Sequence, residues 1–373
     1  MDKDRVALIA LHLIPRIGGA TIRQLLSYFS TAENILKQPK GRLKKIPGIG
    51  ESAAQAILTG NQLIDKAERV LEKAEKLGVK VLLYYDKDYP TRLKNLFDSP
   101  TILFVKGNID LNAQKSISIV GSRNATSYGL GMTREFVAEL KAHNPVIISG
   151  LAYGVDIEAH KTALDNGFDT IAVMASGTDI IYPAAHRKIA EKICSQGALV
   201  TEYVFGVLPD PSRFPARNRI IAGLSDATIV IEAAEKGGAL ITANIANSYN
   251  RDVFALPGNV SNKFSSGCNN LIKSSKAHAI TSVQDLEYIM QWEKQETSSN
   301  TDNLLAQLSD HEERAVVSVL NTNRSPVLLD ELSWKSQVGL NRLASVLLNL
   351  EFRGIVLSLP GKRYQLSGGQ NHA

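Results

Sequence analysis

Cysteine is scarce in this 373-residue chain, which has only Cys194 and Cys268. Two cysteines cannot build a disulfide framework, and this pair does not form the CxxC motif of a typical zinc site. We therefore expect a reducing, cytoplasmic environment in which both thiols are simply buried. We also expect no metal ion and no cofactor.

Long apolar runs are missing too. No segment approaches the roughly 18 uninterrupted apolar residues that identify a membrane-spanning helix. The first residues are partly apolar, but His12 and Pro15 interrupt them and no small-residue cleavage pattern follows. We therefore expect neither a signal peptide nor a membrane partner.

Two glycine patterns of nucleotide-binding folds are absent as well. The chain has no GxGxxG motif, because Arg123 and Asn124 in "GSRNAT" stand where the second glycine would admit a pyrophosphate. It also lacks the GxxxxGKS or GxxxxGKT motif of P-loop proteins. These absences argue against NAD and ATP as ligands.

Basic residues are unevenly distributed along the chain, whose formal net charge is +5. Residues 1–80 carry +6, residues 81–300 carry −1 and residues 301–373 are neutral. Such a weakly basic protein is compatible with a polyanionic partner but does not establish one. Any phosphate site in the middle of the chain must therefore be a local pocket and not a broad basic face.

The length and the 44% apolar content predict two or three domains. Residues 1–75 predict short helices around two similar turns, "LIPRIGGATIRQ" and "LKKIPGIGESAA", with the spacing of a helix-hairpin-helix (SAM-like) domain. These turns either bring backbone N–H groups to a DNA phosphate at a helix start, or are tight turns in a bundle that contacts nothing. Basic residues beside the second turn favour the phosphate; they are Lys40, Arg42, Lys44 and Lys45.

A regular alternation of strands and helices predicts that residues 79–295 form a second domain. Two extended segments around a proline-marked loop occupy 79–110, and short β-rich runs alternate with helical stretches from 116 onward. Continuous apolar strands between helices are typical of a parallel sheet covered on both faces, with right-handed crossovers. The predicted fold class is α/β, with a doubly wound, mainly parallel, extended Rossmann-like sheet.

The polar run at 296–306 predicts a linker. Residues 307–369 follow as three helices and a hairpin, which is the pattern of a winged helix. The third helix offers chiefly Arg342 and Arg353 against Glu351, which is poor for phosphate contacts. We therefore expect the winged helix to contact protein.

Small and polar residues end the predicted strands of the central domain. In a doubly wound sheet, ligands bind beyond the carboxyl ends of the strands, where helix N-termini supply N–H donors and partial positive charge. One such glycine is an ordinary turn, but five glycine-bearing ends on one edge are hard to explain by turns alone. The phosphate-binding candidates are Gly121, Ser122, Arg123, Ser149, Gly150, Lys236, Gly237, Gly238, Thr242 and Gly258.

Two further stretches add polar groups to this edge. In "FPARNRIIAGLSD", Pro215 can open a helix, which would gather Arg217, Asn218 and Arg219 at its N-terminus to grip phosphates or stack on bases. Ion pairs with Glu232 or Asp226 are the alternative for the two arginines. In "SSGCNNLI", an anion nest before a helix is expected from Ser266, Gly267 and Asn269.

The order of these motifs resembles the DNA-processing family DprA, also called Smf. The motifs that carry the resemblance over about residues 80–285 are "SIVGSRNATSYG", "SGLAYGVDIEAH", "FPARNRIIAGLSD", "GGALITANIA", "DVFALPGN" and "GCNNLI". The resemblance implies a non-enzymatic, dimeric protein that binds single-stranded DNA and loads the recombinase RecA in natural transformation and homologous recombination. It assigns the phosphate contacts to 121–123, 217–219 and 236–238, and it suggests a dimer contact near Ile272 and Ala279.

The chain departs from the family pattern at three positions. Tyr153 stands where a basic residue is usual, Gly237 where serine is usual, and Ala184 where lysine often follows "YP". Arg187 and Lys188 lie close enough to substitute for that lysine. Tyr153 either stacks on an unpaired base or is a surface tyrosine.

Two other interpretations compete with DNA binding. The first is a nucleotide phosphoribohydrolase of the lysine-decarboxylase-like superfamily, but this chain has "EKGGALITA" in place of PGGxGTxxE. Glu202 and Glu232 remain as carboxylates, and their spacing shows no acid/base pair. The second is an adaptor that binds only proteins, which predicts no salt-sensitive DNA binding.

Overall fold

The computed structural model describes residues 2–292, 308, 310–322 and 326–366. The chain divides into two compact units, residues 1–294 and 295–373. The predicted boundary near 295 and the predicted linker at 296–306 both lie outside the described residues.

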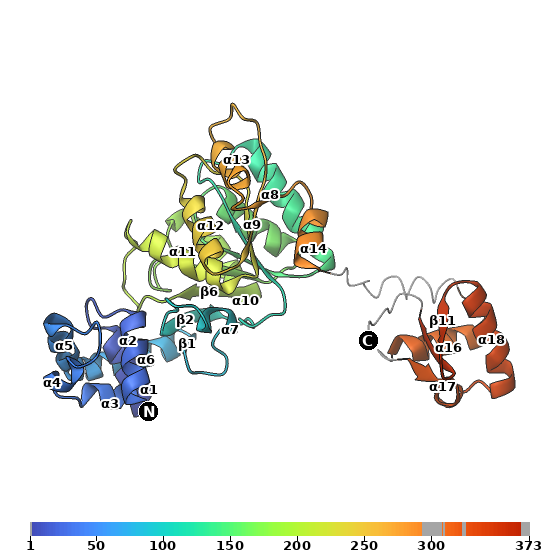
Figure 1. The fold of residues 1–373 in the computed structure, drawn as a ribbon, viewed down its shortest axis with the longest axis horizontal. Coiled ribbons are helices and arrows are strands. Elements are labelled where there is room, and N and C mark those ends of the chain that lie inside the picture. The colour runs from blue at the N-terminus through green and yellow to red at the C-terminus, as the bar shows by residue number, and fades with distance from the viewer. Residues whose placement is uncertain (1, 293–307, 309, 323–325, 367–373) are drawn as a thin grey trace. The chain divides into compact units, whose positions relative to one another are not determined.

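A nine-stranded sheet forms the centre of the larger unit (Figure 1), in the order β1-β2-β6-β5-β4-β3-β7-β8-β9. Strands β3 to β9 pair in parallel, whereas β2 is antiparallel to both β1 and β6. This confirms the mainly parallel α/β fold. The strands are β1 (Val79–Leu83), β2 (Ile102–Gly107), β3 (Ser116–Val120), β4 (Val146–Ser149), β5 (Thr170–Val173), β6 (Gly197–Thr201), β7 (Ala227–Val230), β8 (Asp252–Ala255) and β9 (His278–Ala279).

Helices cover both faces of the parallel strands, which explains why nearly every residue of β3 to β8 is buried. Successive residues of a strand point to opposite faces, so Ile147 of β4 joins one core and Ile148 the other. The first face carries α8 (Ser127–Glu139), α9 (Val155–Asp165), α10 (Arg187–Gln196) and α14 (Val283–Met290). The second carries α7 (Thr91–Lys94), α11 (Arg213–Leu224), α12 (Gly238–Ser248) and α13 (Ser266–Lys273).

The N-terminal helices pack onto the antiparallel end of this sheet. They share one hydrophobic core with Val81 of β1 and Phe104 of β2, and they belong to the same compact unit as the sheet. Helices α2 and α5 begin directly after the two glycine turns that the sequence singled out. These helices are α1 (Lys3–His12), α2 (Gly19–Phe29), α3 (Ala32–Leu36), α4 (Lys40–Leu43), α5 (Glu51–Leu58) and α6 (Ile64–Lys76), with a short 3-10 helix at Thr59–Leu63.

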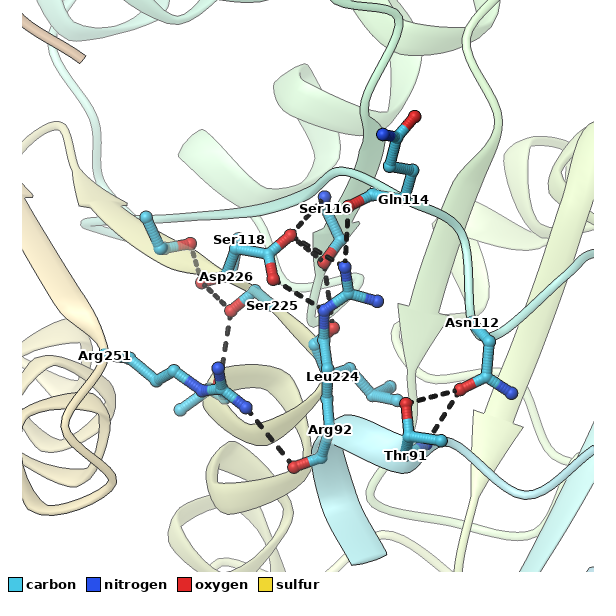
Figure 2. Close-up of polar contacts among 12 residues, drawn as sticks. Thr91, Arg92, Asn112, Gln114, Ser116, Ser118, Leu224, Ser225, Asp226 and Arg251 are labelled. Carbon is cyan, nitrogen blue, oxygen red and sulfur yellow. Dashed lines mark hydrogen bonds and ion pairs between the residues drawn. The ribbon is translucent and has the colours of Figure 1, made fainter. Parts of the chain in front are cut away.

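A polar cluster joins α7 to the amino ends of β3 and β7 (Figure 2). Arg92 donates from Nε and Nη2 to the two carboxylate oxygens of Asp226, at 2.7 and 2.9 Å. Asp226 also accepts from the backbone N–H of Ser116 at 2.8 Å. These contacts lie where the strands begin. They therefore do not occupy the carboxyl ends of the strands, where doubly wound sheets bind ligands.

The smaller unit is a winged helix. Three helices pack around Val317, Leu332 and Leu347, and a three-stranded antiparallel sheet in the order β10-β12-β11 closes the fold. Its elements are α16 (His311–Thr322), β10 (Val327–Leu328), α17 (Leu329–Ser336), α18 (Leu340–Phe352), β11 (Val356–Leu359) and β12 (Arg363–Leu366).

Candidate functional site

The strand order places a crevice beside β3. The chain runs outward from β3 through β4, β5 and β6, and then returns to add β7 on the opposite side of β3. The crossovers therefore leave β3 and β7 in opposite directions, and this switch point is where doubly wound sheets bind ligands. A cavity of about 460 Å³ lies at this point. The predicted residues that line it are Gly121, Ser122, Arg123, Arg217, Asn218, Gly237, Gly238 and Thr242.

Close packing shapes the tip of β3. A Cβ atom on Gly121 would lie 2.5 Å from Cγ2 of Val155, so only glycine lets the strand end approach the start of α9 this closely. The backbone N–H of Ser122 donates to the carbonyl of Glu232 at 2.7 Å, which joins the ends of β3 and β7. Arg123 follows as an exposed residue on the cavity wall.

Helix α12 points its N-terminus into the cavity. Gly237 is its N-cap, and no side chain among the described residues caps its first turn. Gly237, Gly238 and Ala239 all line the cavity, so their backbone and the helix dipole offer a favourable place for an anion. The neighbouring α8 differs, because Thr126 and Glu232 already satisfy its first turn.

Arg217 is buried at the floor of the cavity. Its Nη1 donates to the carbonyls of Gly150, at 2.7 Å, and Val173, both at carboxyl ends of strands. Burial lowers the pKa of Arg217 to about 10, and the Asp156 carboxylate opposes this shift, so the guanidinium stays protonated at neutral pH. Burial raises the pKa of Asp156, and Arg217 opposes that shift in turn. Arg217 therefore brings a fixed, protonated guanidinium to the cavity floor beside Asp156, which also lines the cavity.

An aromatic ring that the sequence analysis missed stands between the two cavity arginines. The Cζ atoms of Arg123 and Arg217 lie 5.2 and 6.0 Å from the ring centroid of Phe214. Tyr182, half-exposed on the cavity wall, lies 5.8 Å from the same ring. The signal was the phenylalanine that begins "FPARNR", a motif whose proline, arginines and asparagine alone entered the prediction.

The structure corrects the expected arrangement of residues 217–219. Helix α11 begins at Arg213, two residues before Pro215, so these residues lie in its second turn and not at its N-terminus. Asn218 faces the cavity with Arg217, but Arg219 lies outside the lining and pairs with Glu202 at 2.5 Å. The physical reason is the helical repeat, because residues two positions apart point about 200° apart.

Several other predicted residues bond within the fold. Ser149 is buried and donates to the carbonyl of Ile119, and Gly150 accepts from Arg217. The structure corrects the expected anion nest at Ser266, Gly267 and Asn269. The backbone N–H of Gly267 is not available to an anion, because it donates to the carbonyl of Ala233 at 2.8 Å. Two side chains in the first turn of α13 also have partners: the Asn269 amide bonds both backbone groups of Gly258, and the Ser266 hydroxyl donates to the carbonyl of Lys263.

The basic and aromatic residues proposed to extend the DNA path lie outside the cavity lining. Tyr153 is half-exposed and packs edge-on against His186, with ring centroids 4.8 Å apart. Arg187 and Lys188 are exposed at the start of α10, where Arg187 lines a separate cavity of about 190 Å³. Lys236 is exposed in the loop just before α12.

The two carboxylates considered for acid/base chemistry have structural partners. Glu232 accepts from the backbone and the hydroxyl of Thr126, at 2.8 and 2.6 Å. Glu202 pairs with Arg219, and burial raises its pKa. Both lie outside the cavity lining. Among the described residues, no group of three or more histidine, cysteine or acidic side chains could hold a metal ion, and no helix is long and apolar enough to cross a bilayer.

Comparisons with known proteins assign the central domain. The family model described as DNA recombination-mediator protein A matches residues 80–291. DNA processing protein DprA of Streptococcus pneumoniae is 42% identical over 72% of this chain and 93% of its own length. This chain belongs to the DprA/Smf family. Further models, a SAM-like helix-hairpin-helix tandem and a DprA winged helix domain, match residues 8–60 and 296–362.

The similarity to DprA/Smf proteins extends over almost the whole chain and to solved structures. Protein Smf of Synechocystis is 30% identical over 98% of this chain and 99% of its own length. The X-ray structure of S. pneumoniae DprA superposes with a TM-score of 0.66 at 34% identity, covering 77% of this chain and 97% of that one. A Helicobacter pylori DprA structure that concerns its single-stranded DNA binding mode gives 0.52 at 30% identity, covering 57% and 95%.

Proposed function

We propose that this DprA/Smf protein binds single-stranded DNA in the cavity at the switch point and performs no chemistry on it. The observation that carries the proposal is the combination found there: the guanidinium groups of Arg123 and Arg217 flank Phe214 beside the uncapped start of α12. Positively charged side chains bind the phosphates of a sugar-phosphate backbone, and an aromatic ring stacks on any unpaired base. The single-stranded DNA binding of the H. pylori relative supports the same ligand.

A titration of labelled oligonucleotides tests this proposal. Single-stranded DNA should bind more tightly than duplex, and its affinity should fall as salt rises, because bound phosphates release counterions. Arg123→Gln should weaken single-strand binding by about tenfold and reduce the slope of log K against log salt by roughly 0.7, the value for one single-strand phosphate contact.

The matched control is Arg69→Gln, which removes an equal charge from an exposed position on α6. It should leave both the affinity and the salt slope close to those of the wild type. Equal losses in the two variants would show that the cavity is not the binding site, and binding that does not respond to salt would favour the protein-only adaptor.

We further propose that the protein loads RecA onto the bound strand. The description of the matching family as a recombination mediator supports this role. The protein should accelerate RecA filament formation on single strands that are already coated with a single-strand binding protein. Arg123→Gln should lose this stimulation together with DNA affinity, and stimulation that survives the loss of DNA binding would contradict the proposal.

We also propose a homodimer with a contact near Ile272 and Ala279. Ala279 lies in β9, the last strand of the sheet order, and is exposed. Ile272 on the neighbouring α13 is only partly buried. Light scattering should give a dimer mass for the wild type and a monomer mass for Ala279→Asp, and a monomeric wild type would refute the proposal.

A further inference from the structure

The segment that carries Phe214 to the cavity is held from its far side by the N-terminal helices. It runs from the end of β6 at Thr201 to the first turn of α11. Its later part forms one wall of the cavity, with Pro211, Phe214 and Pro215 in the lining. Its earlier part, from Glu202 to Gly206, bonds His12 of helix α1, while Lys73 of helix α6 lies over the ring of Phe205 and pairs with Asp179, which accepts from the segment's backbone.

We infer that Arg219, Glu202 and His12 form a positioning clamp, through which helix α1 sets the place of Phe214 and Arg217 in the DNA site. This inference rests on the proposed function, because it concerns the same cavity. It assigns Arg219 a role different from phosphate contact, and it makes the N-terminal helices part of the DNA site's support.

Arg219 is turned away from the cavity by the helix that presents Arg217 to it. The two residues are separated by about 200° around α11, so one helix cannot direct both into the same cavity. Arg219 Nη2 lies 2.5 Å from Oε2 of Glu202, and the side chains are only 18% and 13% exposed. A partly buried pair of this kind is screened little by salt, and it ties α11 to the end of β6.

His12 holds the same glutamate from the opposite side. Its Nε2 lies 2.9 Å from the backbone carbonyl of Glu202, and because a carbonyl only accepts, Nε2 must carry the proton. Burial lowers the pKa of His12 to about 4, so the ring is neutral at physiological pH and keeps this single donor. Glu202 is therefore fixed through its side chain to α11 and through its backbone to α1.

A second set of contacts holds the next residues of the segment. Lys73 on α6 pairs with Asp179 at 2.9 Å, and Asp179 accepts from the backbone N–H of Gly206 at 3.0 Å. Lys73 Nζ also lies 5.0 Å from the ring centroid of Phe205. The helical domain thus contacts the segment at two separate points, which limits how far the cavity wall can move.

The test compares variants by affinity, salt slope and unfolding temperature. Arg219→Gln should weaken single-strand binding three- to tenfold with an unchanged salt slope. Arg123→Gln, which removes the proposed phosphate contact, should lower the slope. Glu202→Gln should also weaken binding, although it removes a negative charge near the DNA and would raise affinity if charge alone mattered. His12→Leu, on α1, should give the same loss.

A double-mutant cycle completes the experiment. The Glu202→Gln and Arg219→Gln double variant should bind no more weakly than the worse single variant, because both changes break one clamp. Arg219→Lys, which keeps a cation for Glu202, should restore most of the affinity. If Arg219→Gln does not fold, Glu202→Gln and His12→Leu provide the same comparison.

The outcomes separate the clamp from the DNA site itself. A salt slope that falls with Arg219→Gln, or an affinity that rises with Glu202→Gln, would overturn the clamp while leaving DNA binding intact. Normal affinity of His12→Leu for single-stranded DNA would show that α1 is not part of the clamp. Absence of salt-sensitive single-strand binding in the wild type, or an Arg123→Gln variant that binds normally, would instead refute the proposed function.

Discussion

Phe214 lies where an unpaired base can stack on its ring while the adjacent phosphates of the strand contact arginines. Its ring lies beside Arg123, Arg217 and Tyr182, and it is part of the cavity wall. Phe214→Leu should cost about 1–3 kcal/mol of single-strand binding, the usual value of one base–aromatic stack, with no change in the salt slope. Phe214→Trp should keep most of the affinity.

Fluorescence anisotropy with a short oligonucleotide measures both quantities for Phe214. Phe97→Leu is the matched control, since that side chain is 72% exposed and its ring packs edge-on against Tyr249. A Phe214→Leu variant as tight as this control would exclude stacking on Phe214.

Gly150 is where the buried charges leave no room for a side chain. A Cβ atom there would lie 2.7 Å from both Nη2 of Arg217 and Oδ2 of Asp156. Gly150→Ala should therefore displace this pair, destabilise the fold by about 1–3 kcal/mol and weaken DNA binding. Urea unfolding measures the first effect.

Gly131→Ala provides the comparison for Gly150 in the same assay. On α8 an added Cβ would be 4.0 Å from its nearest neighbour, Nη2 of Arg134, so alanine should stabilise the helix by up to about 1 kcal/mol. Equal stability of the two alanine variants would mean that the floor of the cavity adapts freely.

Helix α9 is fastened to β5 by a histidine that titrates far below its usual range. His160 is fully buried, its Nδ1 lies 2.7 Å from the hydroxyl of Thr170, and burial lowers its pKa to about 3, with Arg217 and His186 adding to the shift. The unfolded chain thus binds this proton more readily than the folded one. The resulting stability is complete above pH 6.5 and is lost as the pH falls toward 3.

Unfolding free energies at pH 7 and pH 4 should differ by about 3 kcal/mol on account of His160. His160→Asn, which keeps a donor for Thr170 but does not titrate, should be less stable at pH 7 and lose less on acidification. An identical pH dependence in both proteins would show that His160 does not carry this effect.

The boundaries of the elements show where sequence patterns suffice. Strands β3 to β8 lie where the β-rich runs predicted them, because a strand covered on both faces is rich in apolar residues, whereas the short, exposed β9 followed from no such run. The predicted start of α11 at Pro215 was wrong by two residues, because the helix begins at Arg213. Pro215 also fits inside the first turn, where a missing N–H costs nothing. Arg219 points away from the cavity because it lies two positions, or about 200°, from Arg217 in the same helix.

Two arginines of the winged helix pair within its own fold. Arg342 on α18 bonds Glu312 at 2.7 Å, and Arg353, at the end of that helix, bonds Glu313 at 2.8 Å. The same helix exposes Leu340, Leu348 and Phe352. These features are unfavourable for phosphate contacts and favour the expectation that this unit contacts protein.

Removal of the winged helix should therefore have little effect on the DNA site. A chain that ends at residue 303 should bind single-stranded DNA within about twofold of the wild type, at every salt concentration, because its slope depends on phosphates held elsewhere. Anisotropy titrations of the two proteins make the comparison. A large loss of affinity or a shallower slope would place DNA on this unit.

The helical segment at residues 1–75 shows what sequence patterns cannot predict at the scale of the whole molecule. Its turns and helices were predicted, yet the pattern suggested a separate domain, whereas the structure merges its core with β1 and β2. Local spacing reports where a helix turns, but it cannot report which surface the helix covers. The bonds of His12 to the Glu202 carbonyl and of Lys73 to Asp179 became visible only in the folded chain.

Local chemistry in the chain was enough to predict a mainly parallel sheet and the glycine-rich edge with Arg123, because strand burial, turns and motif order depend on neighbouring residues. It could not supply the strand order that brings β3 beside β7, nor the partners of Arg217 and Arg219. Those depend on groups brought together by the fold, such as the carbonyl of Gly150 and the carboxylate of Glu202. Two arginines of one short motif thus acquired different environments, one in the cavity floor and one in an ion pair behind it.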